Sequence, residues 1–181
     1  MKRLKRTVGS LVPVALFVAA CGGSVPAQEE ERISFSAQLS TAVWYSEAGE
    51  AQGLGGPANG VVAEDGNIYL DTISVGAPSD GAAHVSGALT VDVPDRDVVE
   101  LGVSVGFATG SEGSAIFRVY VQDGEQFPLL AEVVGAADGR LDSLVADLTP
   151  YRGENRLIIL SVAPVDHSAV PLWIAPQLLT P

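Results

Sequence analysis

The fold is decided by the stretch Val99-Glu100-Leu101-Gly102-Val103-Ser104-Val105-Gly106-Phe107, in which every second residue is a large apolar one. Successive side chains of a strand point to opposite faces, so a period of two predicts a strand with one buried face. The same alternation runs from Val85 to Val93 before this stretch and from Ile116 to Val121 after it. These three runs predict a sheet whose odd-numbered apolar side chains pack inward.

Shorter runs of the same kind predict strands along the rest of the chain, at 33–39, 67–73, 129–134, 156–162 and 172–179. The run 156–162 is almost continuously apolar and predicts a strand buried on both faces. Pro176, inside the last run, fits a sheet edge or a bulge, because proline cannot donate a ladder hydrogen bond. Residues 142–148 fit either a strand or a single helical turn.

The segments between these runs are typical of turns. Asp123-Gly124 and Asp138-Gly139 are tight-turn dipeptides, whereas the glycine-rich stretch 46–66 predicts a long loop of functional or mobile character. No window of twelve residues carries a helical stripe with caps. With about eight short strands, the chain is predicted to be all-β, a two-layer antiparallel sandwich over 32–181.

The N-terminal residues have the composition of an export signal. Four basic residues lie within Met1–Arg6, and a short apolar run from Leu11 to Ala20 follows, far below the ~20 residues of a spanning helix. Val18-Ala19-Ala20-Cys21 resembles the cleavage box of bacterial lipoproteins. The resemblance implies a signal peptide at 1–21, a lipidated Cys21, a flexible acidic stalk at 22–31 and an extracytoplasmic location on a bacterial cell membrane or outer membrane. The alternative is an ordinary signal peptide with a cysteine at the cut site by chance.

The charge of the chain excludes one class of partner. All 22 acidic residues follow Cys21, and the six basic residues that follow it are arginines, so the segment after Cys21 carries a formal charge of −16. Nucleic acids are bound mainly through clusters of Lys and Arg. We therefore expect no nucleic-acid partner, and a membrane contact through the lipid anchor alone.

From Tyr69 onward the order of features resembles a galactose-binding-like jelly roll. The matching stretches are Gly81–His84 leading into Gly87–Val93, Val99–Phe107, Ala115–Gly124, Asp147–Gly153 before Leu157–Leu160, and Trp173–Pro176. The resemblance is to the carbohydrate-binding modules found beside bacterial glycoside hydrolases. It implies an antiparallel jelly-roll sandwich, a glycan ligand and no catalytic activity of its own.

A sugar site needs exposed aromatic rings against the apolar face of a pyranose, with polar groups on its hydroxyls. The residues predicted to bind ligand are Trp44, Tyr45, Tyr120 and Tyr151. Trp44-Tyr45 is the expected exposed pair beside the glycine-rich loop, and Tyr120 falls on the register opposite Phe117 and Val119. Trp173 is expected in the core.

The metal and catalytic alternatives are weaker. Asp92, Asp95 and Asp97 surround a proline turn and could supply oxygen ligands to a structural Ca²⁺, or form a solvated acidic loop. No cofactor is otherwise required. Asp166-His167-Ser168 contains the residue types of a catalytic triad, but neighbours on an extended chain point in alternating directions, so a polar loop is expected.

Two hypotheses follow for the function. The first is a non-catalytic envelope lipoprotein that binds glycan through the jelly roll. The alternative is an envelope scaffold or protein-interaction lipoprotein with no sugar ligand. The resemblance to the carbohydrate-binding modules is the argument that favours the first.

Overall fold

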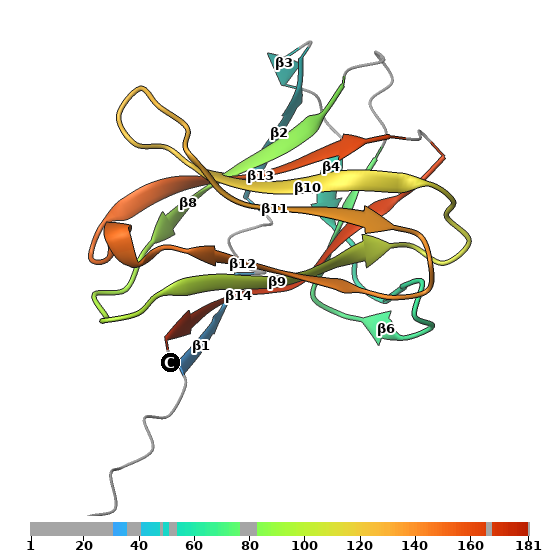
Figure 1. The fold of residues 1–181 in the computed structure, drawn as a ribbon, viewed down its shortest axis with the longest axis horizontal. Helices are drawn as coiled ribbons and strands as arrows, with labels where there is room; N and C mark the ends of the chain where they lie inside the picture. The colour runs from blue at the N-terminus through green and yellow to red at the C-terminus, as the bar shows by residue number, and fades with distance from the viewer. Residues whose placement is uncertain are drawn as a thin grey trace, which may run out of the picture.

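Two stacked antiparallel sheets make up the molecule (Figure 1). The structure is a computed structural model and describes residues 31–35, 41–47, 49–50, 54–76, 83–165 and 168–180. Sheet A has the order β12 (Asp142–Asp147), β9 (Glu100–Phe107), β14 (Pro171–Thr180), β7 (Thr72–Val75) and β4 (Gly55–Pro57), with β1 (Glu31–Ser34) also pairing with β14. Sheet B has the order β11 (Leu129–Ala136), β10 (Ser114–Val121), β13 (Asn155–Pro164), β8 (Val85–Asp92), β2 (Val43–Ser46) and β3 (Gly49–Glu50).

The core lies between the sheets and is built by the predicted alternation. Val99, Leu101, Val103, Val105 and Phe107 are all buried. The odd-numbered apolar residues of β8 and β10 are buried in the same way, and Trp173 on β14 is fully buried, as expected. The all-β antiparallel jelly-roll prediction is confirmed.

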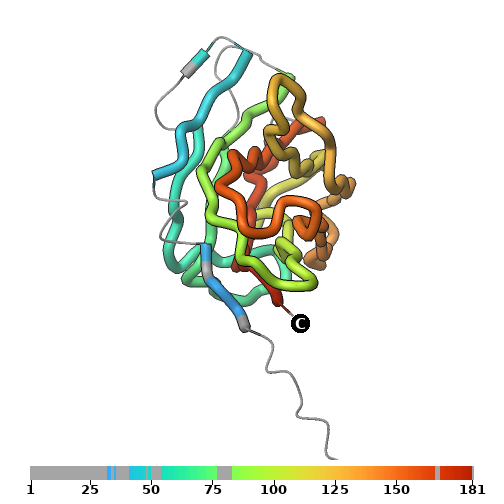
Figure 2. The backbone as a smooth tube through the Cα atoms, turned by 90° about the vertical axis from the view of Figure 1, so that its left-hand side faces the viewer, coloured from blue at the N-terminus to red at the C-terminus, as the bar shows by residue number. Residues whose placement is uncertain are grey.

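The first and last described strands pair with each other at one side of the sandwich. In Figure 2 the blue β1 lies beside the red end of β14, and Glu31 pairs with Thr180. The segments coloured cyan to green, from β2 to β7, lie along one flank of the sandwich in Figure 2, where β2 and β3 form one edge of sheet B and β7 and β4 form one edge of sheet A.

Three local predictions are corrected by the structure. The stretch 46–66 is not one long loop, since it holds β3, β4 and part of a two-stranded ribbon, β5 (Val61–Val62) with β6 (Ile68–Tyr69). The run 156–162 is not buried on both faces: Ile158 and Leu160 face the core, but Ile159 is half-buried on the outer face of sheet B, which no third layer covers in the described part of the chain. The described residues contain fourteen strands rather than about eight, because short edge strands carry too few residues to show alternation.

Two ambiguous segments are settled. Residues Asp142–Asp147 form a strand, and the one turn of 3₁₀ helix follows at Thr149–Tyr151. The register of β14 against β9 shifts between Ile174 and Gln177, with Ala175 at a φ of 47°, so Pro176 lies at a bulge as predicted. Among the described residues there is no helix with the length and apolarity to cross a membrane.

The β5–β6 ribbon covers part of the outer face of sheet A, over β14. Ala63, Leu172 and Ile174 form a small second core beneath it. Glu64 fastens the ribbon to the sandwich, because its Oε1 accepts from the Phe107 N–H and its Oε2 from the Gly139 N–H, each at 3.0 Å. The outer face of sheet B carries no such cover within the described residues.

Candidate functional site

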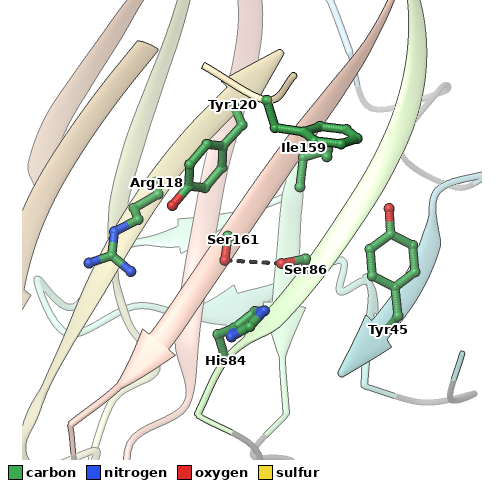
Figure 3. Close-up of a pocket in the computed structure, with 8 residues that line it drawn as sticks. Tyr45, His84, Ser86, Arg118, Tyr120, Ile159 and Ser161 are labelled. Atoms are coloured by element: carbon green, nitrogen blue, oxygen red, sulfur yellow. Dashed lines mark hydrogen bonds between the residues drawn. The ribbon is translucent and has the colours of Figure 1, made fainter. Parts of the chain in front are cut away.

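A pocket of about 320 Å³ opens on the outer face of sheet B (Figure 3). Four strands and the loops at their ends supply its lining, which consists of Tyr45, His84, Ser86, Arg118, Tyr120, Phe127, Ile159 and Ser161. The lining therefore combines two phenol rings and one phenyl ring with two serine hydroxyls, one guanidinium, one imidazole and one aliphatic side chain.

The alternation that builds the core also aims these side chains outward. On β10, Phe117, Val119 and Val121 are fully buried, which leaves Arg118 and Tyr120 on the opposite face. The same reasoning places Ile159 and Ser161 of β13 outside, because Ile158 and Leu160 face the core.

Strand register brings the polar residues into one row across sheet B. Glu132 on β11 pairs with Arg118 on β10, Arg118 with Ser161 on β13, Ser161 with Ser86 on β8, and Ser86 with Tyr45 on β2. Because neighbouring strands lie about 4.8 Å apart, Tyr45 and Arg118 stand at opposite ends of a row that spans on the order of 14 Å.

An apolar row runs beside the polar one. Tyr120 pairs with Ile159, Ile159 with Ala88, and Ala88 with Val43. Figure 3 shows Tyr120 and Tyr45 on opposite sides of the hydrogen-bonded pair Ser86 and Ser161, whose Oγ atoms are 3.0 Å apart. The pocket thus has aromatic walls and a hydroxyl floor.

The Arg118 guanidinium and the His84 imidazole each lie beside a carboxylate. The Arg118 Nε donates to Glu132 Oε2 at 2.6 Å, and this bond is the largest cause of the raised pKa of Arg118. His84 Nδ1 lies 3.4 Å from Glu47 Oε1, with both side chains about half exposed. Burial raises the pKa of the Tyr45 phenol above its usual 10.0, so this hydroxyl remains a hydrogen-bond donor at neutral pH.

The structure brings together two of the four residues predicted to bind ligand. Tyr45 and Tyr120 both line the pocket. Trp44 does not: its side chain is 6% exposed, so the expectation of an exposed Trp44-Tyr45 pair is wrong for the tryptophan. The indole points into the core because Gly55 and Gly87 leave room for it, with ring atoms where a Cβ of either glycine would stand.

Tyr151 lies away from the pocket. It follows β12 in the 3₁₀ turn, is half-buried and packs against the main core. The guanidinium of Arg156 lies over its ring at 5.0 Å from the centroid. Its position fits the support of a turn better than contact with a ligand.

The predicted calcium ligands do not form a group. Among the described residues no cluster of three or more His, Cys, Asp or Glu side chains could hold a metal ion. Asp92 instead accepts a hydrogen bond from the Asn155 side-chain amide on the paired strand β13. Asp92, Asp95 and Asp97 are therefore not brought together as a ligand group in the described part of the chain, and the structure gives no support to a Ca²⁺ site there. Cys21 and the pair 166–167 lie outside the described residues.

Sequence reasoning missed six lining residues: His84, Ser86, Arg118, Phe127, Ile159 and Ser161. Arg118 could have been predicted from the sequence. It and Tyr120 are both even-numbered residues of a strand whose odd-numbered residues are all apolar, so the two side chains share the outer face. The remaining five depend on which strands become neighbours, and the spacing along the chain does not carry that information.

No family model and no curated protein matches the chain. Solved structures do match. The family 22 xylan-binding domain of Xyn10C from Paenibacillus barcinonensis superposes with a TM-score of 0.51 at 20% identity, covering 83% of this chain and 93% of that one. A family 61 carbohydrate-binding module in complex with β-1,4-galactotriose gives a TM-score of 0.52 at 13% identity, covering 82% and 94%.

The fold is that of carbohydrate-binding modules. A third similar structure, an exo-β-agarase, gives a TM-score of 0.53 at 11% identity and covers 86% of this chain but 25% of the agarase, so the match is to one part of that enzyme. Identities this low establish the shared jelly roll and leave the ligand to be argued from the site.

Proposed function

We propose that the domain is a non-catalytic module that binds glycan in the pocket on the outer face of sheet B. The observation that carries the proposal is the placement of Tyr45 and Tyr120 on opposite sides of the Ser86 and Ser161 hydroxyls. Aromatic faces suit the apolar C–H faces of a pyranose, while hydroxyls exchange hydrogen bonds with its edge. The jelly-roll fold shared with the xylan-binding domain and the galactotriose-bound module supports the same class of ligand.

The lining residues favour binding over catalysis. Glycoside hydrolysis ordinarily uses two Asp or Glu carboxyls that flank the scissile bond. None of the eight lining residues in the described part of the chain carries a carboxyl group. Glu132 lies beside the pocket but is engaged with Arg118.

We also propose that the domain binds glycan while the protein is anchored to a membrane surface. The lipoprotein-like sequence at Val18–Cys21 supports a tether through Cys21 to a bacterial envelope membrane, with 22–31 as the connecting stalk. Such a tether would hold the glycan-binding domain in the extracytoplasmic space, where envelope or environmental glycans are met.

Binding by the full-length chain in detergent tests the proposal. The purified protein is screened on a glycan array with and without Ca²⁺, and titrated with xylohexaose and β-1,4-galactotriose. Tyr45→Ala and Tyr120→Ala are each expected to weaken binding about tenfold or more, since truncating an aromatic anchor typically removes over ~1.4 kcal/mol. Tyr120→Phe should keep most of the affinity.

The matched control is Val145→Ala, a half-exposed apolar residue on β12 of sheet A, on the other layer of the sandwich. It should bind as the wild type does, with melting temperatures recorded for all variants. Retention of no oligosaccharide by the wild type would contradict the glycan function, and equal losses in Val145→Ala would contradict the pocket as its site.

A further inference from the structure

The floor of the pocket has an unusual composition for its degree of burial. Ser86 and Ser161 face each other on β8 and β13, and their side chains are 6% and 4% exposed. They are two of five buried polar residues among the described part of the chain. Two positions away on the same strands lie Ala88, Ile159 and Ala163, with His84 on the other side of Ser86. The two serines are therefore the buried polar groups at the centre of the row that Tyr45 and Arg118 flank.

The hydrogen-bond capacity of this pair exceeds what the fold uses. Each hydroxyl has one donor and two acceptor positions. The bond between Ser86 Oγ and Ser161 Oγ takes one donor and one acceptor. Within the described residues neither hydroxyl makes another hydrogen bond, so one O–H and several lone pairs remain. Buried polar groups are ordinarily satisfied, which leaves these for an occupant of the pocket.

The positive charge of Arg118 beside the pair already has a carboxylate partner. Glu132 holds Arg118 at one end of the polar row, and Glu47 stands next to His84. An anionic sugar would have to compete with Glu132 for the guanidinium, in a protein whose segment after Cys21 carries a formal charge of −16. A ligand without charge meets neither obstacle.

We infer that Ser86 and Ser161 together determine the specificity of the pocket for an uncharged sugar, by hydrogen bonding one of its hydroxyls between the two tyrosines. This inference rests on the proposed glycan-binding function. It adds which side chains make the polar contact with the sugar and that the sugar is uncharged. Glu132 acts through Arg118, as a positioning residue that keeps the guanidinium from recruiting a carboxylate ligand.

The serine pair is tested in the full-length chain with Ser86→Ala/Ser161→Ala. Xylohexaose and β-1,4-galactotriose are the neutral probes, and a xylo-oligosaccharide of the same length with one glucuronate branch is the charged probe. The double variant should bind the neutral probes about fivefold to tenfold more weakly, equivalent to one or two hydrogen bonds of ~1 kcal/mol. Its melting temperature should change little, because removing both partners leaves no unpaired group.

Glu132→Gln tests the charge class. Releasing Arg118 should raise the affinity for the glucuronate probe relative to xylohexaose by about fivefold, as an unpaired guanidinium becomes available to a carboxylate. Ser143→Ala on β12, an exposed serine of sheet A, is the matched control for the serine variants.

The outcomes distinguish failure of the proposed glycan-binding function from failure of the serine contact or of the preference for uncharged sugars. A wild type that binds no glycan overturns the proposed function and this inference with it. A wild type that binds neutral probes while the double serine variant binds them equally well overturns the serine contact alone. Preference of the wild type for the glucuronate probe overturns the charge class.

Discussion

The indole of Trp173 and the ring of Phe117 meet edge to face, with centroids 5.3 Å apart and planes at 89°. Trp173 belongs to β14 of sheet A and Phe117 to β10 of sheet B, so this contact joins the two layers. Phe107 adds a second edge contact to Phe117 at 5.9 Å. All three rings are fully buried. The outer residues of β10, which line the pocket, therefore stand on a strand fixed from below by aromatic packing.

Phe117→Ala is expected to lower the free energy of unfolding by about 3–5 kcal/mol, because it removes a buried ring and leaves a cavity between the sheets. Urea denaturation followed by tryptophan fluorescence measures it. Phe127→Ala is the matched control, since this ring is 50% exposed; it should change stability by no more than about 0.5 kcal/mol. Similar losses in both variants would contradict the bridging role of Phe117.

Trp173→Phe is expected to be milder than Trp173→Ala. The indole Nε1 of Trp173 is buried and has no hydrogen-bond partner among the described residues, so replacing it with a phenyl ring discards an unsatisfied donor while keeping most of the contact. We expect a loss below about 2 kcal/mol for phenylalanine and about 3–5 kcal/mol for alanine. Equal losses of unfolding free energy in the two variants would contradict the view that the ring contact, and not the indole nitrogen, carries the stabilisation.

Gly55→Ala should destabilise the fold by about 1–3 kcal/mol through overpacking. A Cβ at this position would lie 2.4 Å from Cδ2 of the buried Trp44. The neighbouring Gly56→Ala is the matched control, because its Cβ would meet open space. Thermal melts with near-ultraviolet circular dichroism report both stability and displacement of the indole. A larger destabilisation by Gly56→Ala than by Gly55→Ala would contradict the explanation that Gly55 leaves room for the buried Trp44 indole.

The central strands could be predicted because one period settles both their existence and their orientation. In β9 every second residue is apolar and the others are small or polar, so only one face can be the buried one. In β10 Ile116 is the one large aliphatic residue on the outward parity, and Arg118 and Tyr120 still mark that face as the outer one. The bulge at Pro176 could be predicted because proline has no backbone N–H to donate to a sheet. The short strands β3 to β6 contain two or three residues each and offer no period to detect.

The site could be predicted only in part. Val43-Trp44-Tyr45 is apolar at consecutive positions, so its hydrophobicity cannot tell which residue faces inward. The deciding features are Gly55 and Gly87, which come next to Trp44 only in the folded sandwich. Ser86 and Ser161 are 75 residues apart and meet through the β8–β13 register, which local pattern does not specify. Aromatic candidates were accessible to sequence reasoning, whereas the polar floor depended on topology.

Cys21→Ser is expected to move the protein from the membrane fraction to the soluble fraction. The reasoning is that several acyl chains on one residue anchor stably, while the rest of the chain is strongly acidic and is repelled by anionic lipid heads. Fractionation of bacteria expressing the full gene product, with mass spectrometry of the N-terminal peptide, measures both location and modification. An unacylated Cys21 in membrane-extracted wild type would contradict the tether.

Glu64→Gln is expected to change how stability depends on pH. Burial raises the pKa of the Glu64 carboxyl above its usual 4.5, and the Gly139 and Phe107 N–H groups offset part of that rise. The folded state then holds the proton more tightly than the unfolded chain, so this stabilising contribution is present below about pH 4.5 and lost as the pH rises through the folded-state value. The unfolding free energy of the wild type relative to Glu64→Gln should therefore decrease from about pH 4 to about pH 7. A difference that stays constant or increases would contradict the partial burial of this carboxyl where the ribbon meets the sandwich.

Asp65 is adjacent to Glu64, and the substitution Asp65→Asn should reveal the opposite dependence of the unfolding free energy on pH. The Asp65 carboxylate accepts hydrogen bonds from the Asn67 N–H at 3.0 Å, from the Asn67 amide at 2.8 Å and from the Tyr69 hydroxyl at 2.8 Å. The backbone bond from Asn67 is the largest cause that holds the pKa of Asp65 below its usual 3.8. Its contribution is thus present above about pH 3.8 and lost as the pH falls through the folded-state value. In urea titrations across this range, the wild type should lose stability relative to Asp65→Asn on acidification. The same slope in both variants would indicate a general charge effect of the acidic chain rather than two opposed carboxyls in one ribbon.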